Sequence, residues 1–229
     1  MTSASPLINS VVLDARQRLR DGREKIRKQH DQGAPGPQVC AQITDLFDGI
    51  ILDIWNAATA ELLTPAQRTQ LALIAHGGYG RRDLAPFSDV DIMLVPTRGL
   101  GSAVQPVAAR LSRDIVDAGL QLGFSVRSPG EACRLAWKDA VIFSSLAESR
   151  LLSGSLHVYS RFFNSLRRGA RRRRGPLVEL LQQARREERV KWGETNYLLR
   201  PNVKRSRGGL RDLQFIRWIG FICDGETEP

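Results

Sequence analysis

The chain of 229 residues has no apolar run that approaches the ~20 residues a membrane helix requires. Its start, Met-Thr-Ser-Ala-Ser-Pro, lacks the basic and then apolar layout of a secretory signal. Cysteine is scarce, and Cys40, Cys133 and Cys223 lie too far apart to fit a metal-ligand spacing, which is typical of reduced thiols. These absences predict a protein without a membrane partner, located in the cytoplasm.

Common nucleotide and metal motifs are also missing. The three histidines, His30, His76 and His157, are too dispersed for a histidine-rich metal hydrolase. No Gly-x-x-x-x-Gly-Lys-[Ser/Thr] phosphate loop occurs, and Asp83 stands where a dinucleotide fingerprint would need glycine. ATPases of the phosphate-loop class and dinucleotide-dependent dehydrogenases are therefore excluded.

Acidic residues are fewer than basic ones, 24 against 34, and the excess is local. Residues 161–191 hold eleven basic and three acidic side chains, centred on Arg171–Arg174. Such a segment is either a polyanion surface or a solvated helix face. Because no aromatic residue interleaves with the arginines, the solvated face is favoured, and nucleic acid is kept as a less favoured partner.

The apolar pattern predicts a small α/β unit between helical segments. Helical spacing is seen in residues 7–30, 39–62 and 103–120, whereas 71–76, 89–95 and 120–127 have the pattern of strands. Nearly everything from 131 to 221 is predicted to be helical, apart from breaks at Gly154 and Gly175 and a loop over 200–209. We therefore divide the chain into residues 1–64, 65–130 and 131–229.

Two aspartates stand at the start of the second predicted strand. Because side chains alternate along a strand, Asp89 and Asp91 would share one face, about 6.6 Å apart along the backbone. Hard oxygen ligands of this kind suit Mg²⁺, with Mn²⁺ as the alternative. The pair alone is more typical of two aspartates at the exposed mouth of a strand, hydrogen-bonded in a turn, than of a metal site.

A glycine-rich turn precedes these aspartates and strengthens the metal interpretation. Gly77, Gly78 and Gly80 follow the first predicted strand, and their backbone amides are accessible to phosphate oxygens. Arg81 adds positive charge, and Ser88 offers a hydroxyl donor next to Asp89. A phosphate cradle beside a metal site is what nucleotidyl transfer requires.

Two long motifs carry a resemblance to a known family. They are Gly77-Gly78-Tyr79-Gly80-Arg81-x-Asp83-Leu84-x-Pro86-Phe87-Ser88-Asp89-Val90-Asp91 and Pro201-Asn202-Val203-Lys204-Arg205-Ser206-Arg207-Gly208-Gly209-Leu210-Arg211-Asp212-Leu213-Gln214. Both resemble segments of bacterial PII-protein uridylyltransferases, which belong to the DNA polymerase β-like nucleotidyltransferase superfamily. Residues 123–127 and 147–154 also lie in the family's order, so the resemblance runs from about residue 10 to 223.

The resemblance implies an α+β fold, a small mixed sheet of the polymerase β-like type with flanking helices. It implies a Mg²⁺-dependent enzyme that transfers UMP from UTP to a tyrosine of the nitrogen-regulatory protein PII. On this interpretation Asp89 and Asp91 bind the metal, and Gly77, Gly78, Ser88 and Arg81 contact the triphosphate. Lys204, Gly208, Gly209 and Arg211 would form a second wall of the cleft.

The sequence departs from the family pattern in several places. Phe124 stands where family members usually carry histidine, and residues 121–127 contain no third acidic ligand. Asp114 and Asp117 belong to the preceding predicted helix and are expected to point elsewhere. The family's HD and ACT domains are not present in these 229 residues, so we expect a fragment of a longer enzyme.

Two alternatives stay open at this point. One is a non-catalytic module that binds nucleotide or PII. The other is nucleotidyl transfer to a different acceptor, such as another protein or an RNA end, because no residue that chooses between UTP and ATP can be identified.

Overall fold

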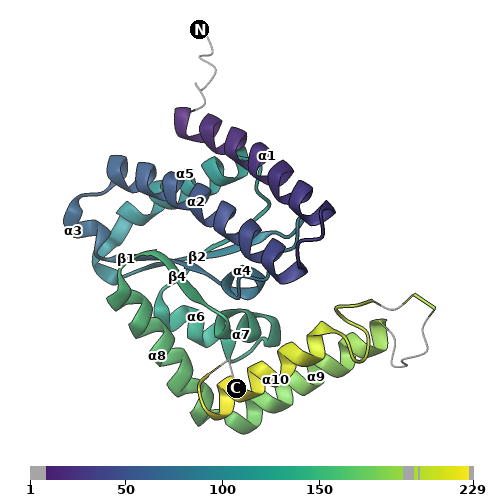
Figure 1. Ribbon diagram of the computed structural model, residues 1–229. Helices are drawn as coiled ribbons and strands as arrows, with labels where there is room; N and C mark the ends of the chain where they lie inside the picture. Colours follow the sequence, from purple (N-terminus) through teal and green to yellow (C-terminus); the bar gives the residue numbers. More distant parts are fainter. Residues whose placement is uncertain (1–8, 193–198, 201, 227–229) are drawn as a thin grey trace, which may run out of the picture. The chain divides into compact units, whose positions relative to one another are not determined.

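A computed structural model describes residues 9–192, 199–200 and 202–226, so that Pro201 of the second motif lies outside the described residues. The chain forms two compact units (Figure 1). The first contains the chain up to Ser128 together with Ser149–Tyr159, and the second contains Pro129–Glu148 and the chain from Ser160 onward.

The described chain begins and ends with helices, and strands alternate with helices in its middle part. The helices are α1 (Ser10–Asp31), α2 (Gly36–Leu62), α3 (Pro65–Arg68), α4 (Gly77–Gly80), the 3-10 helix η1 (Arg98–Ala103), α5 (Val104–Asp117), α6 (Pro129–Ala136), α7 (Ala140–Ala147), α8 (Leu156–Arg172), α9 (Arg174–Trp192) and α10 (Leu210–Cys223). The strands are β1 (Leu71–Ala75), β2 (Val90–Pro96), β3 (Leu122–Val126) and β4 (Arg150–Gly154). No helix in the described part of the chain is long and apolar enough to cross a membrane.

The four strands form one mixed sheet in the order β3-β2-β1-β4. β1 pairs antiparallel with both β2 and β4, whereas β2 and β3 are parallel. The parallel pair is connected through α5, as expected for a crossover between parallel strands. The predicted α+β class with a small mixed sheet is confirmed.

One secondary-structure prediction is wrong. Residues 150–154 were expected to be helical, but they form β4, which pairs with the edge of β1. The apolar part of this strand, Leu151 and Leu152, is too short to show a period that separates strand from helix. Gly154 ends the strand at φ +88°, with its Cα so close to β1 that an added Cβ would lie 2.3 Å from the Leu71 carbonyl oxygen.

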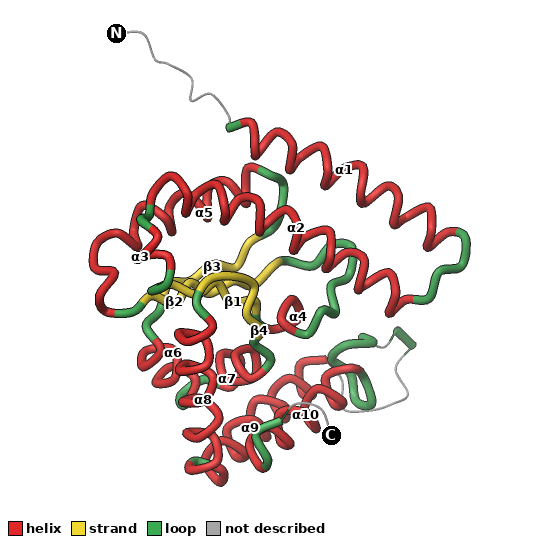
Figure 2. Tube along the Cα trace, turned by 60° about the vertical axis from the view of Figure 1, so that its left-hand side comes forward, coloured by secondary structure: helices red, strands yellow, loops and turns green. Residues whose placement is uncertain are grey.

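The core of the first unit lies between one face of the sheet and the helices α1, α2 and α5 (Figure 2). Alternate residues of β2, Val90, Ile92 and Leu94, are buried in this core. Burial of each such side chain contributes roughly 1.5–3 kcal/mol. Because side chains alternate, Asp91 belongs to the opposite face of the sheet.

A single carboxylate joins three elements of this unit. Asp48, on α2, accepts hydrogen bonds from the Tyr79 hydroxyl at 2.6 Å and from Arg150 Nη2 at 2.7 Å. Arg82 Nη1 lies 3.4 Å from the second oxygen of Asp48. The Arg150 guanidinium stacks on the Tyr79 ring, 5.0 Å from its centroid. Burial, and then the charge of Asp48, raise the pKa of Tyr79, so this phenol remains a neutral donor.

The second unit packs its helices around aromatic side chains. Phe221 of α10 contacts Phe143 of α7, with ring centroids 6.1 Å apart. Trp218 is buried, and its indole nitrogen donates to Glu148 Oε1 at 2.8 Å. This bond fixes α10 against the end of α7 within the unit.

We predict that Asp48→Asn lowers the free energy of unfolding by about 2–3 kcal/mol, because Tyr79 and Arg150, both largely buried, lose a charged hydrogen-bond acceptor. Asp53→Asn, on the same helix, is the matched control, since Asp53 also pairs with an arginine, Arg18, but is half exposed. The control should lose no more than about 1 kcal/mol. Urea unfolding measures both, and equal losses would contradict the role given to Asp48.

Candidate functional site

The predicted glycine turn is present and directly follows β1. His76 is extended, and Gly77–Gly80 form the single helical turn α4. Gly77 has φ +60°, a conformation that residues with a Cβ seldom adopt. The His76 backbone N–H donates to the Asp91 carbonyl at 3.1 Å, which ties the turn to β2. The structure therefore brings Gly77 and Gly78 next to the strand that carries Asp91.

The turn is held from outside by α2. Arg82, at φ +65°, forms ion pairs with Asp45 and Asp48 of that helix. Together with the Tyr79–Asp48 hydrogen bond, these contacts fix the later part of the turn, from Tyr79 to Arg82. No sequence pattern indicates a role for Asp48 or Arg150, because their partners are distant in the sequence.

The two aspartates have different surroundings. β2 begins one residue later than predicted, so Asp89 is exposed directly before the strand and Asp91 is its half-buried second residue. Asp91 stands opposite Gly123 in the parallel register with β3. A Cβ on Gly123 would lie 2.4 Å from Asp91 Oδ1, so the carboxylate occupies space that only glycine leaves open.

The third strand explains why the site contains only two carboxylates. Phe124 and its alternate neighbours Leu122 and Val126 pack against the hydrophobic core. Only Gly123 and Ser125 are on the face of Asp91. Asp114 is buried on α5 in ion pairs with Arg110 and Arg113, which confirms that it points elsewhere.

The donor set fits magnesium. The described residues contain no group of three or more His, Cys, Asp or Glu side chains placed to hold a metal ion. Mg²⁺ keeps several water ligands and is commonly held by one or two carboxylates together with substrate phosphates. Asp89 and Asp91 would be those carboxylates, with Asp91 Oδ1 lying over Gly123 in the space that glycine leaves.

The segment between the turn and β2 is locally ordered. Ser88 Oγ accepts the Ala85 N–H at 3.0 Å, and its hydroxyl proton can still be donated. Arg81 is largely buried and pairs with Asp83 at 3.0 Å. Phe87, to which sequence analysis gave no role, is 94% exposed within this turn. An exposed aromatic ring beside the two aspartates can contact an incoming ligand.

The second motif folds back on itself. Asn202 Oδ1 accepts the backbone N–H groups of Lys204 and Arg205 at 3.1 and 2.9 Å. Gly208 has φ +78°, and a Cβ on Gly209 would lie 2.7 Å from the Val203 carbonyl oxygen. Asparagine and both glycines therefore have structural roles in the shape of this loop.

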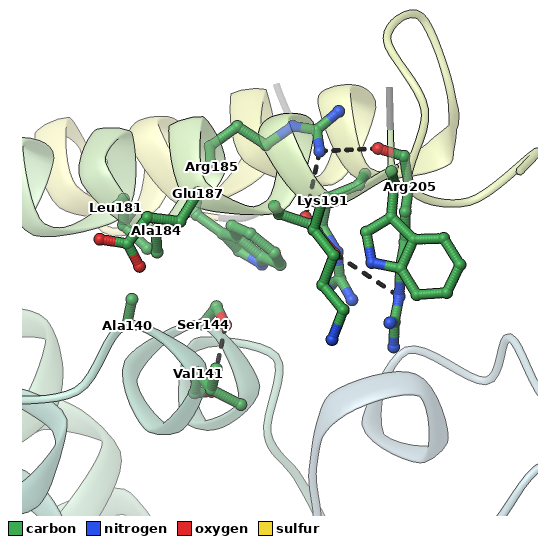
Figure 3. Close-up of a pocket in the computed structure, with 13 residues that line it drawn as sticks. Ala140, Val141, Ser144, Leu181, Ala184, Arg185, Glu187, Lys191 and Arg205 are labelled. Carbon is green, nitrogen blue, oxygen red and sulfur yellow. Dashed lines mark hydrogen bonds and ion pairs between the residues drawn. The ribbon is translucent and has the colours of Figure 1, made fainter. Parts of the chain in front are cut away.

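Arg185 of α9 supports the loop through hydrogen bonds. It is 5% exposed and donates to the Arg205 carbonyl at 2.9 Å (Figure 3). It also donates to Asp212 Oδ1 at 2.7 Å. Although burial raises the pKa of Asp212, hydrogen bonds from Arg185, Arg189 and the Gly208 N–H lower it well below its ordinary value. The lowered pKa favours the charged form of Asp212, whose hydrogen bonds hold the motif together.

A hollow of about 450 Å³ lies beside this loop in the second unit (Figure 3). Lys191, Arg205, Arg211 and Trp218 are among the residues that line it. Arg205 and Arg211 stand 3.6 and 3.7 Å from Glu188, so part of their charge is compensated. Lys204, Gly208, Gly209 and Arg211 all belong to the second unit, and their contact with a nucleotide stays a prediction.

Comparison with known families identifies two matching segments. Residues 21–134 match the nucleotidyltransferase family DUF294, and residues 178–226 match the family GlnD PII-uridylyltransferase. The first segment contains the glycine turn and both aspartates, and the second contains the loop organised by Asn202 and Asp212. The class of protein that these matches support is a nucleotidyltransferase.

Curated relatives agree with this class. The chain is 34% identical over 223 residues to a bifunctional uridylyltransferase/uridylyl-removing enzyme of Nitrosospira multiformis. The aligned region covers 95% of this chain and 24% of that protein. Enzymes of the same name from Aromatoleum aromaticum and Erythrobacter litoralis are 34% and 35% identical to this chain. Their alignments cover 93% and 95% of this chain and, in both cases, 24% of the relative. The chain is therefore a relative of the PII uridylyltransferases, as its motifs predict, and it spans about a quarter of their length.

We predict that Gly123→Ala weakens binding of Mn²⁺, used as a spectroscopic substitute for Mg²⁺, by about 10- to 100-fold, because the new methyl group displaces the Asp91 carboxylate. Ser125→Ala, two residues along β3, is the matched control and should bind as the wild type does. Electron paramagnetic resonance of free Mn²⁺ measures both affinities. Unchanged binding by Gly123→Ala would contradict the placement of the metal at Asp91.

We also predict an acid-sensitive contribution from Asp212. Because its pKa is lowered in the folded state, its stabilisation is present above the ordinary value of 3.8 and is lost as the pH falls below it. Asp212→Asn should cost about 3 kcal/mol near neutral pH, because buried Arg185 then keeps only Glu188 as an anionic partner. The deficit should shrink below pH 3.8. Exposed Asp224→Asn is the control, and a deficit that does not change with pH would contradict this assignment.

Proposed function

We propose that this chain is the nucleotidyltransferase part of an enzyme that transfers UMP from UTP to a tyrosine of the PII protein. The observation that carries the proposal is the Asp91 carboxylate, lying over Gly123 on a strand tied to the glycine turn. The names of the relatives support uridylyl transfer as the reaction, and the match to the GlnD PII-uridylyltransferase family supports PII as the acceptor.

The chain's own residues divide the work of binding and orientation. The amides of Gly77 and Gly78 and the hydroxyl of Ser88 would bind triphosphate oxygens, and Arg81 would add positive charge. Asp89 and Asp91 would hold Mg²⁺, which supplies charge neutralisation and a lowered pKa of the attacking hydroxyl when it is bound. Phe87 would contact the incoming acceptor or base.

The transfer itself exchanges one phosphorus–oxygen bond for another. The tyrosine oxygen forms a bond to the α-phosphorus of UTP, and the bond between that phosphorus and the bridging oxygen to the β-phosphate breaks. Pyrophosphate carries away the electron pair, and the hydroxyl proton passes to solvent. No covalent enzyme intermediate is needed for this exchange. Catalysis would come from positioning by the glycine turn and from electrostatic stabilisation of the transition state.

We predict that Asp89→Asn and Asp91→Asn each reduce the transfer of label from α-labelled UTP to purified PII by at least about 100-fold, with nucleotide binding partly retained. The matched control is Asp117→Asn, which removes an aspartate from α5 and should leave transfer unchanged. Parallel reactions with α-labelled ATP measure the choice of base.

Three outcomes separate the functions under consideration. Label from UTP on PII that depends on both aspartates supports the proposal. Label from either nucleotide on RNA or on another protein, but not on PII, replaces the acceptor. Nucleotide binding without any transfer by the wild-type chain favours the non-catalytic module.

A further inference from the structure

A second basic surface lies in the second unit, away from the loop around Asp212 in the sequence. A hollow of about 520 Å³ runs between α6 and α8. Its lining includes Arg161, Arg168, Arg172 and Arg173 on one side and Cys133 and Trp137 on the other. None of the residues that line it, all from the described part of the chain, is acidic. We call this hollow the arginine groove.

The arginines are ordered in a row by the helix. Arg161, Arg168 and Arg172 are separated by seven and four residues, which places them on one face of α8. From the first to the last, the helix rises by about 16 Å. Because Arg168 and Arg172 are like charges four residues apart, they repel each other in the absence of an anion.

These four arginines differ from the cations that surround Glu188 and Asp212. Arg185, Arg189, Arg205 and Arg211 all have carboxylate partners in Glu188 or Asp212. Within the described residues, no carboxylate lies within ion-pair distance of the four arginines of the groove. Their charge is therefore uncompensated by the part of the protein that the structure describes.

The opposite wall is neutral and fixed in place. The Trp137 indole lies directly on Gly169 of α8, where an added Cβ would be 2.4 Å from Cζ2. Arg173 stacks on the same indole, 5.2 Å from the ring centroid. Burial raises the pKa of the Cys133 thiol to about 11 despite the opposing charge of Arg173, so this side chain is neither a charge nor a reactive thiolate.

From this geometry we infer that the arginine groove binds the phosphodiester backbone of a single-stranded nucleic acid. An uncompensated row of about 16 Å matches a chain of several phosphates better than one compact anion. The site is separate from the residues of the proposed transferase reaction. It provides a physical reason for the basic segment that sequence analysis interpreted as a solvated face.

The same features predict that the groove does not distinguish one base sequence from another. Arg173 stacks on the Trp137 ring and Gly169 packs against the same indole, so stacking of bases on this ring is not part of the inferred binding. With contacts limited to phosphates, binding is independent of base sequence and strongly dependent on salt. We expect a single strand rather than a duplex, because the arginines form one row that follows one phosphate chain.

The test uses the full chain and a fluorescein-labelled 12-nucleotide oligouridylate, followed by anisotropy at several salt concentrations. Affinity should fall with salt at a log–log slope of about −2 to −3, the value for three to four phosphate contacts on a single strand. Arg161→Gln/Arg168→Gln/Arg172→Gln should bind at least tenfold more weakly and with a shallower slope. Oligoadenylate should bind like oligouridylate, and a 12-base-pair duplex should bind more weakly.

The matched control is Arg174→Gln/Arg186→Gln/Arg217→Gln, which removes the same charge from exposed positions of the same unit outside the groove. The inference is overturned if this control loses as much affinity as the groove variant, or if polyglutamate or UTP displaces the strand as well as oligonucleotide does. Transfer to PII by the groove variant should equal that of the wild type. Failure of the transferase assay therefore leaves this test unaffected.

Discussion

The first unit depends on the hydrogen bonds that the Asp48 carboxylate accepts. This carboxylate stands on α2, yet it accepts hydrogen bonds from the glycine turn through Tyr79 and from β4 through Arg150. A turn of four residues has too few internal hydrogen bonds to hold one conformation. Its geometry therefore depends on α2, and the proposed triphosphate cradle is as rigid as the packing of that helix on the sheet.

A second constraint comes from the parallel register of β2 and β3. This register sets Asp91 against Gly123, and a shift by one residue would put the core side chain of Leu122 or Phe124 there instead. The missing third carboxylate thus follows from the same strand alignment that gives Asp91 its space. The two-aspartate site is a consequence of the sheet as well as of the motif.

Sequence patterns predicted the parts of the molecule that are local. The glycine turn, β1, β2 and the helices around them were recognisable because their periodicity and turn residues lie within short windows. Asp48, Arg150 and β4 were missed because each depends on a partner far along the chain. The arginine groove was missed for the same reason: the arginines were visible, but Trp137 approaches them only in the folded unit.

The position of β4 in the chain has a consequence for how the protein can be divided. The strand that completes the sheet comes from residues 150–154, after the chain has left the first unit to build α6 and α7. A polypeptide ended after β3 would leave the backbone of β1 unpaired along one edge, with Leu71 to Ala75 forming a short apolar ribbon. Such an edge is a template for intermolecular strand addition. The shortest segment that keeps the sheet closed on that side must therefore extend through Gly154, carrying two helices of the other unit within it.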